Sequence, residues 1–174
     1  PLHDSLGPLA YLKSVPGRMQ IVHGHPENAQ IIVDYAHTSD ALAAALAALR
    51  PAATGKLAVL FGCGGDRDKG KRAKMGQIAN DGADQIFVTD DNPRREDAAS
   101  IRASIITACP NAIEIASRDK AIAAALANVQ SGDVLLIAGK GHETVQLLGN
   151  ESLPFDDAAI ASHLMLQMQK ETVQ

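Results

Sequence analysis

The sequence has no tryptophan, and aromatic residues make up only 3% of its 174 residues. Proteins that bind single-stranded nucleic acid stack the bases on aromatic side chains, so this scarcity argues against that class. The formal net charge of −4 also disfavours nucleic acid and anionic membranes as partners. We therefore expect a partner that is a small molecule.

Long apolar runs are also missing. No run is long enough to span a bilayer, and the first residues do not resemble a signal peptide. The only two cysteines, Cys63 and Cys109, lie far apart beside apolar runs, which indicates free thiols in a reducing compartment. We expect a cytoplasmic, monomeric protein that does not enter membranes.

Apolar runs alternate with helical patterns through most of the chain. Strands are expected at residues 19–23, 30–35, 56–61, 85–89, 112–116 and 133–138, and helices at 40–49, 74–81, 97–107, 118–128 and from 156 onward. Thr38 and Ser117 are the expected helix caps. The first two strands read as a hairpin, and 144–148 and 151–153 as edge strands. The pattern predicts a Rossmann-like, doubly wound α/β fold with a mostly parallel sheet and an antiparallel edge.

Four of these strands end in polar or glycine-rich loops, at residues 34–37, 62–72, 90–95 and 139–143. In a parallel sheet such loops meet at one edge, where ligands bind. Pro93 stiffens the third loop, although its charges could instead only cap the next helix.

The charges in these loops suit a small zwitterion such as an amino acid. Arg67 and Arg94 can each donate two parallel hydrogen bonds to a carboxylate. Asp91 and Glu143 suit an amine. Lys140 could bind a phosphate or a carboxylate, or it could have only a structural role.

Parts of the sequence are similar to known binding motifs but lack residues that these motifs require. The loop at 62–72 lacks the glycine spacing of a dinucleotide fingerprint, and Arg72 replaces the Ser or Thr of a P-loop. Read as a calcium loop, it has Gln77 where a bidentate carboxylate is required. His23 and His25 lack further ligands at a spacing suited to zinc. We expect no metal site and no catalytic nucleophile in the chain.

Five motifs occur in an order that resembles one family. They are VPGRM (15–19), DYAHT (34–38), GCGGDRDKGKR (62–72), DNPR (91–94) and GKGHE (139–143). Together they resemble the C-terminal domain of the Mur ligases, ATP-dependent ligases of peptidoglycan synthesis. The resemblance covers nearly the whole chain and departs from the family at Ser39, where proline is usual. It implies that residues 1–14 are the tail of a preceding central domain and that residues 15–174 are the amino-acid-binding domain.

The resemblance also implies the ligands. An intact DNPR motif implies meso-diaminopimelate as the incoming amino acid and UDP-MurNAc-L-Ala-D-Glu as its acceptor. The implied amino-acid contacts are Arg67, Asp91, Asn92, Pro93, Arg94, Gly139 and Glu143. ATP would be contacted by Arg18, Asp34 and His37. Mg²⁺, the ATP P-loop and a carbamylated lysine belong mainly to the family's central domain, so the 174 residues alone are expected to be inactive.

Two other classes remain open at this point. A free-standing Rossmann-like nucleotide-binding module would bind nucleotide tightly without further domains. A protein-interaction module would bind no amino acid, so the loss of Arg94 would change no such binding.

Overall fold

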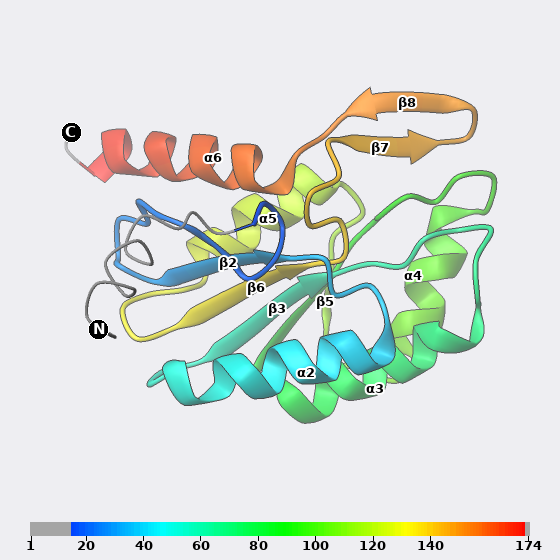
Figure 1. Ribbon diagram of the computed structural model, residues 1–174, viewed down its shortest axis with the longest axis horizontal. Helices are drawn as coiled ribbons and strands as arrows, with labels where there is room; N and C mark the ends of the chain where they lie inside the picture. Colours follow the sequence, from blue (N-terminus) through cyan, green and yellow to red (C-terminus); the bar gives the residue numbers. More distant parts are fainter. Residues whose placement is uncertain (1–14, 173–174) are drawn as a thin grey trace, which may run out of the picture.

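The computed structural model describes residues 15–172, in which helices cover both faces of a central sheet (Figure 1). The segment predicted to be a domain tail, residues 1–14, lies outside the described residues. The strands are β1 (Gln20–Val22), β2 (Gln30–Asp34), β3 (Leu57–Phe61), β4 (Gln85–Val88), β5 (Ile113–Glu114), β6 (Val134–Ala138), β7 (Val145–Leu148) and β8 (Glu151–Pro154). The helices are α2 (Ser39–Leu49), the short 3-10 helix η2 (Arg50–Ala52), α3 (Gly70–Gly82), α4 (Ala98–Ile106), α5 (Arg118–Ala127) and α6 (Asp157–Thr172).

The main sheet has the strand order β1-β2-β6-β3-β4-β5. β1 pairs antiparallel with β2, and every other neighbouring pair is parallel. The doubly wound fold with an antiparallel edge is therefore confirmed. The placement of β7 and β8 as edge strands was wrong, because they form a separate two-stranded sheet. β6 already has β2 and β3 on its two sides, so the chain that follows it cannot pair with β6 in the main sheet.

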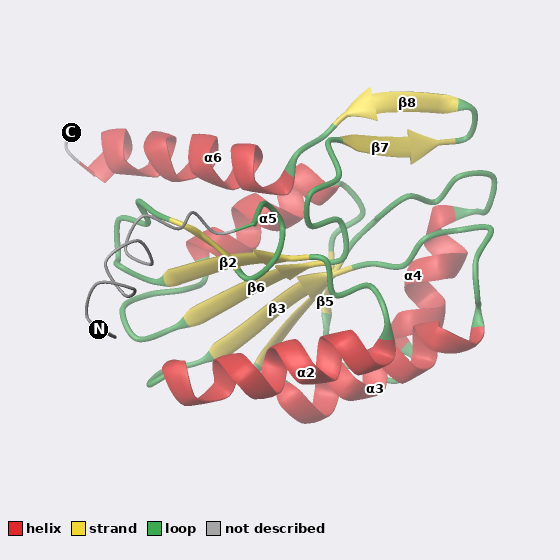
Figure 2. Ribbon diagram, viewed as in Figure 1, coloured by secondary structure: helices red, strands yellow, loops and turns green. Residues whose placement is uncertain are grey.

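Two apolar cores lie on opposite faces of the sheet. α2, α3 and α4 pack on one face, and α5 and α6 pack on the other (Figure 2). β3 and β6 are buried at every residue, as expected for central parallel strands covered on both sides. None of the helices in residues 15–172 has the length and apolarity needed to cross a bilayer.

Helix starts agree only partly with the expected ones. The Thr38 hydroxyl accepts a hydrogen bond from the Ala41 N–H at 3.3 Å, so the predicted cap of α2 is confirmed. Ser117 precedes α5, but its hydroxyl donates to Asp119 and caps no backbone N–H. α3 begins at Gly70 rather than at residue 74. The first turn of α3 is highly charged but still helical. Its Arg72 side chain is buried and bonds Glu96 in the loop after β4.

Candidate functional site

A polar cavity of about 450 Å³ lies at the carboxyl ends of the parallel strands. The chain leaves β2, β3 and β4 toward helices on one face but leaves β6 toward α6 on the other, which opens a crevice there. Its lining residues are Tyr35, His37, Thr38, Gly62, Gly64, Arg67, Asp68, Lys71, Asp91, Asn92, Arg94, Gly139 and Glu143. All four predicted loops contribute to this lining.

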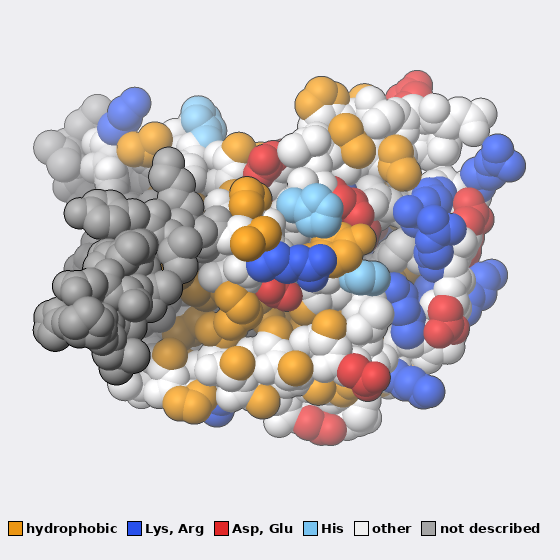
Figure 3. All heavy atoms as spheres, viewed as in Figure 1, with side chains coloured by type: hydrophobic (Ala, Val, Ile, Leu, Met, Phe, Trp, Pro, Cys, Tyr) orange, Lys and Arg blue, Asp and Glu red, His pale blue; other side chains and the backbone are white. Residues whose placement is uncertain are grey.

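Most of the predicted amino-acid contacts meet in this cavity. Pro93 belongs to the loop at residues 90–95 but does not line the cavity. Two of the expected ATP contacts, Arg18 and Asp34, do not line it either. Lys and Arg side chains gather at the right-hand edge of the molecule in Figure 3, the edge toward which the parallel strands run in Figure 1. A larger hollow of about 850 Å³ along β1 contains no charged side chain among its described lining residues. The polar cavity is therefore the better candidate for an ionic ligand.

Acidic and basic groups in the cavity retain free hydrogen-bonding capacity. Within residues 15–172 the Asp91 carboxylate and Glu143 Oε1 accept no hydrogen bond, although Glu143 Oε2 does. Among the described residues, the one hydrogen bond from the Arg67 guanidinium goes to the adjacent Asp66 carbonyl, at 3.0 Å. Arg94 uses Nη1 for the Gly65 carbonyl at 2.9 Å and leaves Nε and Nη2 available in that part of the chain. The cavity can thus pair with both carboxylates and amines.

The loop at residues 91–94 is held by the β7–β8 hairpin. Gln146 Nε2 donates to the Asp91 carbonyl at 2.7 Å, and the Leu147 N–H donates to Asn92 Oδ1 at 2.9 Å. The backbone of Arg94 donates to Leu147 at 3.1 Å and accepts from Gly149 at 2.7 Å. Arg94 has a φ of +53°, which an L-residue adopts only when its surroundings impose it. The hairpin is what imposes this conformation.

Gly139 approaches the same loop from the end of β6. Its φ is +116°, and a Cβ added there would lie 2.8 Å from Asp91 Oδ2. Gly149 also has a positive φ, +59°, but nothing lies within 4 Å of its added Cβ. An alanine would be strained at both positions, but more so at Gly139, whose φ lies outside the left-handed region and whose surroundings are also more crowded.

This pair gives a stability prediction. Gly149→Ala is expected to lower the free energy of unfolding by about 1–2 kcal/mol through strain alone. Gly139→Ala should lower it further, because its φ of +116° is less accessible to an alanine and its methyl group must also move the Asp91 carboxylate. Urea unfolding of both variants measures the difference, and equal losses would contradict this expectation.

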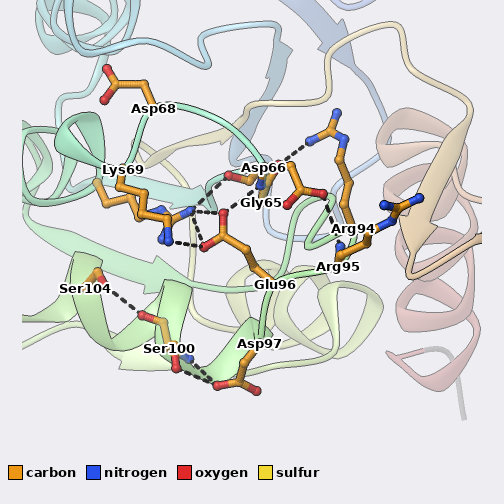
Figure 4. Close-up of polar contacts among 12 residues, drawn as sticks. Gly65, Asp66, Asp68, Lys69, Arg94, Arg95, Glu96, Asp97, Ser100 and Ser104 are labelled. Atoms are coloured by element: carbon orange, nitrogen blue, oxygen red, sulfur yellow. Dashed lines mark hydrogen bonds and ion pairs between the residues drawn. The ribbon is translucent and has the colours of Figure 1, made fainter.

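Glu96 joins the charged loop before α3 to the loop after β4 (Figure 4). Both carboxylate oxygens accept from Arg72 Nη2 at 3.0 Å, and Oε1 also accepts from the Asp66 N–H at 2.6 Å. Lys69 Nζ lies 3.4 Å from Oε2. The hydrogen bonds from Arg72 and Asp66 lower the pKa of Glu96 from its usual 4.5 to about 2. The sequence does not single out this contact, because Arg72 lies in the first turn of α3 and Glu96 in the loop after β4.

The shift predicts an acid-dependent contribution to stability. Because the pKa is lower in the folded state, the carboxylate stabilises the fold fully above its unfolded pKa and loses this effect as pH falls through about 2. Glu96→Gln should therefore destabilise the chain at neutral pH, and its deficit relative to the unsubstituted chain should shrink on acidification. Urea unfolding across that pH range tests this, with the exposed Glu151→Gln as control. A deficit that stays constant with pH would refute the assignment.

The three residues expected to contact ATP gather at the end of β2. Arg18 Cζ lies 4.6 Å from the centre of the Tyr35 ring, which also stands 4.4 Å from the His37 ring. Asp34 Oδ2 accepts from the Met19 N–H at 2.7 Å. Of the three, only His37 lines the cavity. Tyr35 belongs to the DYAHT motif, but the sequence predicts no role for it. In the structure its ring contacts both Arg18 and His37.

Cysteine and metal chemistry have little support in this part of the chain. Cys63 and Cys109 are free and buried, and burial raises the pKa of Cys63 to about 11, so its thiol stays protonated at neutral pH. Within residues 15–172 no three His, Cys, Asp or Glu side chains are placed to hold a metal ion together. His25 instead bonds the Leu126 carbonyl at 2.9 Å and the Glu27 N–H, which makes it a structural residue.

Sequence comparison identifies a family with these features. A family model described as "Mur ligase, glutamate ligase domain" matches residues 17–141. A UDP-N-acetylmuramoyl-L-alanyl-D-glutamate–2,6-diaminopimelate ligase of Mesorhizobium japonicum is 51% identical over 157 residues, which are 90% of this chain and 32% of that protein. A Caulobacter vibrioides protein of the same name is 53% identical over 151 residues, 87% of this chain and 31% of that protein.

Solved structures give the same result. The structure of a UDP-N-acetylmuramoyl-L-alanyl-D-glutamate–2,6-diaminopimelate ligase matches with a TM-score of 0.84 and 37% identity, over 97% of this chain and 35% of that one. A bifunctional folylpolyglutamate synthase/dihydrofolate synthase from Yersinia pestis shares the fold, with a TM-score of 0.61 and 19% identity over 90% of this chain and 32% of that one. The chain thus spans about a third of the length of the relatives it matches.

The fold and the cavity define an α/β domain with a polar cavity where its parallel strands end. Within this class the chain belongs to the Mur ligase family, whose glutamate ligase domain it matches over most of its described length.

Proposed function

We propose that this chain is the amino-acid-binding domain of an ATP-dependent ligase that joins meso-diaminopimelate to UDP-MurNAc-L-Ala-D-Glu. The observation that carries the proposal is the meeting of Asp91, Glu143, Arg67 and Arg94 in one cavity. Diaminopimelate has a carboxylate and an ammonium group at each end, which matches two acids and two guanidiniums. The names of the relatives at about 50% identity support the same substrate.

In the proposed reaction ATP supplies the phosphoryl group that activates the γ-carboxylate of the glutamyl residue. An amine of diaminopimelate attacks that carbon, phosphate leaves, and an amide bond forms. The part of this domain is to bind and orient the amino acid. Asp91 and Glu143 would hold an ammonium group, while Arg67 and Arg94 would hold carboxylates. Catalysis would come from placing the amine close to the activated carbon.

The nucleotide would approach the end of β2. The Arg18 guanidinium, stacked on Tyr35, suits phosphate oxygens, and Asp34 suits ribose hydroxyls. His37 lies between this group and the amino-acid cavity. The described residues offer no ligand cluster for Mg²⁺, so we assign no residue of this part of the chain to the ion. We also propose that residues 15–174 form the domain and that residues 1–14 lead into it.

The test is amino-acid-dependent release of phosphate by a full-length ligase that contains this chain. With ATP and UDP-MurNAc-L-Ala-D-Glu present, meso-diaminopimelate is expected to support turnover and L-lysine is not. The 174-residue chain alone is the control and should release no phosphate. Turnover that does not depend on diaminopimelate, or that L-lysine supports equally, would overturn the proposal.

A further inference from the structure

Lys140 is fully buried although it lies between Gly139 and Gly141 in a ligand-binding loop. The sequence leaves open whether its ammonium group meets a ligand or has a structural role, and the burial of Lys140 favours the structural role. Lys140 does not line the cavity, and its side chain is 0% exposed. A buried ammonium group must be fully hydrogen-bonded, so its partners show its role.

The three N–H donors of Lys140 match three acceptors. Nζ lies 3.1 Å from Asn92 Oδ1, 3.2 Å from Glu143 Oε2 and 2.5 Å from the Val145 carbonyl. An ammonium group has three donors and no acceptor, so this set uses its capacity completely. Two of the three partners are cavity-lining side chains, and the third begins β7.

Lys140 is one of three neighbours that fix which way the Asn92 amide faces. Oδ1 receives two donors, Lys140 Nζ and the Leu147 N–H, whereas Nδ2 donates to Glu143 Oε2 at 2.8 Å. A flipped amide would place its NH₂ against both donors and its oxygen against a carboxylate. All three neighbours therefore require the same orientation of Asn92.

The same contacts orient Glu143. Its Oε2 accepts from both Lys140 and Asn92, so the carboxylate is held by one oxygen. Its Oε1 has no hydrogen-bond partner among residues 15–172 and belongs to a cavity-lining side chain. Lys140 and Asn92 hold Oε2, so Oε1 remains available for an ammonium group of a ligand.

We propose that Lys140 is a positioning residue that fixes Asn92 and Glu143 in the orientation in which they bind the amino-acid substrate. The inference rests on the proposed function, because it assigns Asn92 and Glu143 to amino-acid binding. Lys140 does not contact the substrate. It acts by filling the buried side of a network whose other side faces the cavity, as groups behind a binding site commonly do.

The test is a double-mutant cycle in the full-length ligase. Lys140→Met keeps an unbranched side chain of nearly the same length and removes all three donors. It is expected to raise KM for meso-diaminopimelate about ten- to a hundredfold, because buried acceptors lose their partner. KM for ATP should stay within about threefold. The exposed Lys74→Met is the matched control and should change neither constant.

The second half of the cycle separates positioning from general structural damage. If Lys140 acts through Asn92, then Lys140→Met should cost much less in an Asn92→Ala background than in the unsubstituted enzyme. Two results would overturn the inference and leave the proposed function intact. One is a KM increase in the double variant equal to the product of the increases in the two single variants. The other is an unchanged KM for diaminopimelate in Lys140→Met. Lys140→Gln, which keeps a donor, replaces Lys140→Met if that variant does not fold. Absence of diaminopimelate-dependent turnover in the unsubstituted enzyme would overturn both.

Discussion

Asp157→Asn is expected to lower the free energy of unfolding by about 3–5 kcal/mol, because it leaves a buried guanidinium without its counter-charge. Arg118 and Asp157 are both fully buried and make two hydrogen bonds, of 2.8 and 2.7 Å. Burial alone would lower the pKa of Arg118, but the charge and hydrogen bonds of Asp157 outweigh it and raise this pKa above its usual value. Within the described chain Arg118 Nη1 has no hydrogen-bond partner, so the guanidinium depends strongly on this one acid.

Two further variants give this prediction its controls. The apolar double variant Arg118→Met/Asp157→Leu should recover most of the lost stability, since no unpaired charge then remains in the core. Lys69→Met, which removes a largely exposed ammonium group from its ion pair with Glu96, should have a much smaller effect. Urea unfolding at neutral pH measures all of them. A loss for Asp157→Asn no larger than that for Lys69→Met would contradict the prediction.

Arg94→Lys is expected to raise KM for meso-diaminopimelate about ten- to a hundredfold in the full-length ligase, although it conserves the charge. The guanidinium uses Nη1 to hold the Gly65 carbonyl and keeps Nε and Nη2 for a carboxylate. A lysine has one nitrogen and cannot do both. KM for ATP should change little, because Arg94 lies in the loop after β4 and not beside Tyr35.

The neighbouring residue provides the matched control. Arg95 is exposed, does not line the polar cavity, and makes no side-chain hydrogen bond within residues 15–172. Arg95→Lys should therefore leave KM for diaminopimelate unchanged. An equal effect at both positions would indicate general electrostatic attraction rather than a geometric fit at Arg94. An unchanged KM in Arg94→Lys would remove Arg94 from the proposed contacts.

The sequence predicts the fold class well because the signals are local. Apolar runs, caps such as Thr38 and glycine-rich strand ends all lie within a few residues of the structure they specify. The strand order is different, since β6 lies between β2 and β3, which precede it by many residues. Such long-range pairing leaves no local signature, and neither does the choice of β7 and β8 to pair with each other rather than with an edge of the main sheet.

The cavity residues also differ in how well the sequence predicts them. Arg67, Asp91, Arg94 and Glu143 could be grouped from sequence because each follows a parallel strand, and such strands end at one edge. Their supporting residues could not. Gln146 is an ordinary glutamine in a short strand, and its contact with the Asp91 backbone depends on where the hairpin folds. The charge of Lys140 suggested a ligand, and only its burial shows that it binds protein groups.

The attachment of the β7–β8 hairpin to the 91–94 loop has a mechanical consequence. The strands of the hairpin are largely exposed, yet four hydrogen bonds tie Gln146, Leu147 and Gly149 to the loop that lines the cavity. A ligand that moves this loop must move the hairpin with it. The turn at Gly149 and Asn150 therefore offers a place for a spectroscopic label that reports occupancy of the cavity from outside it.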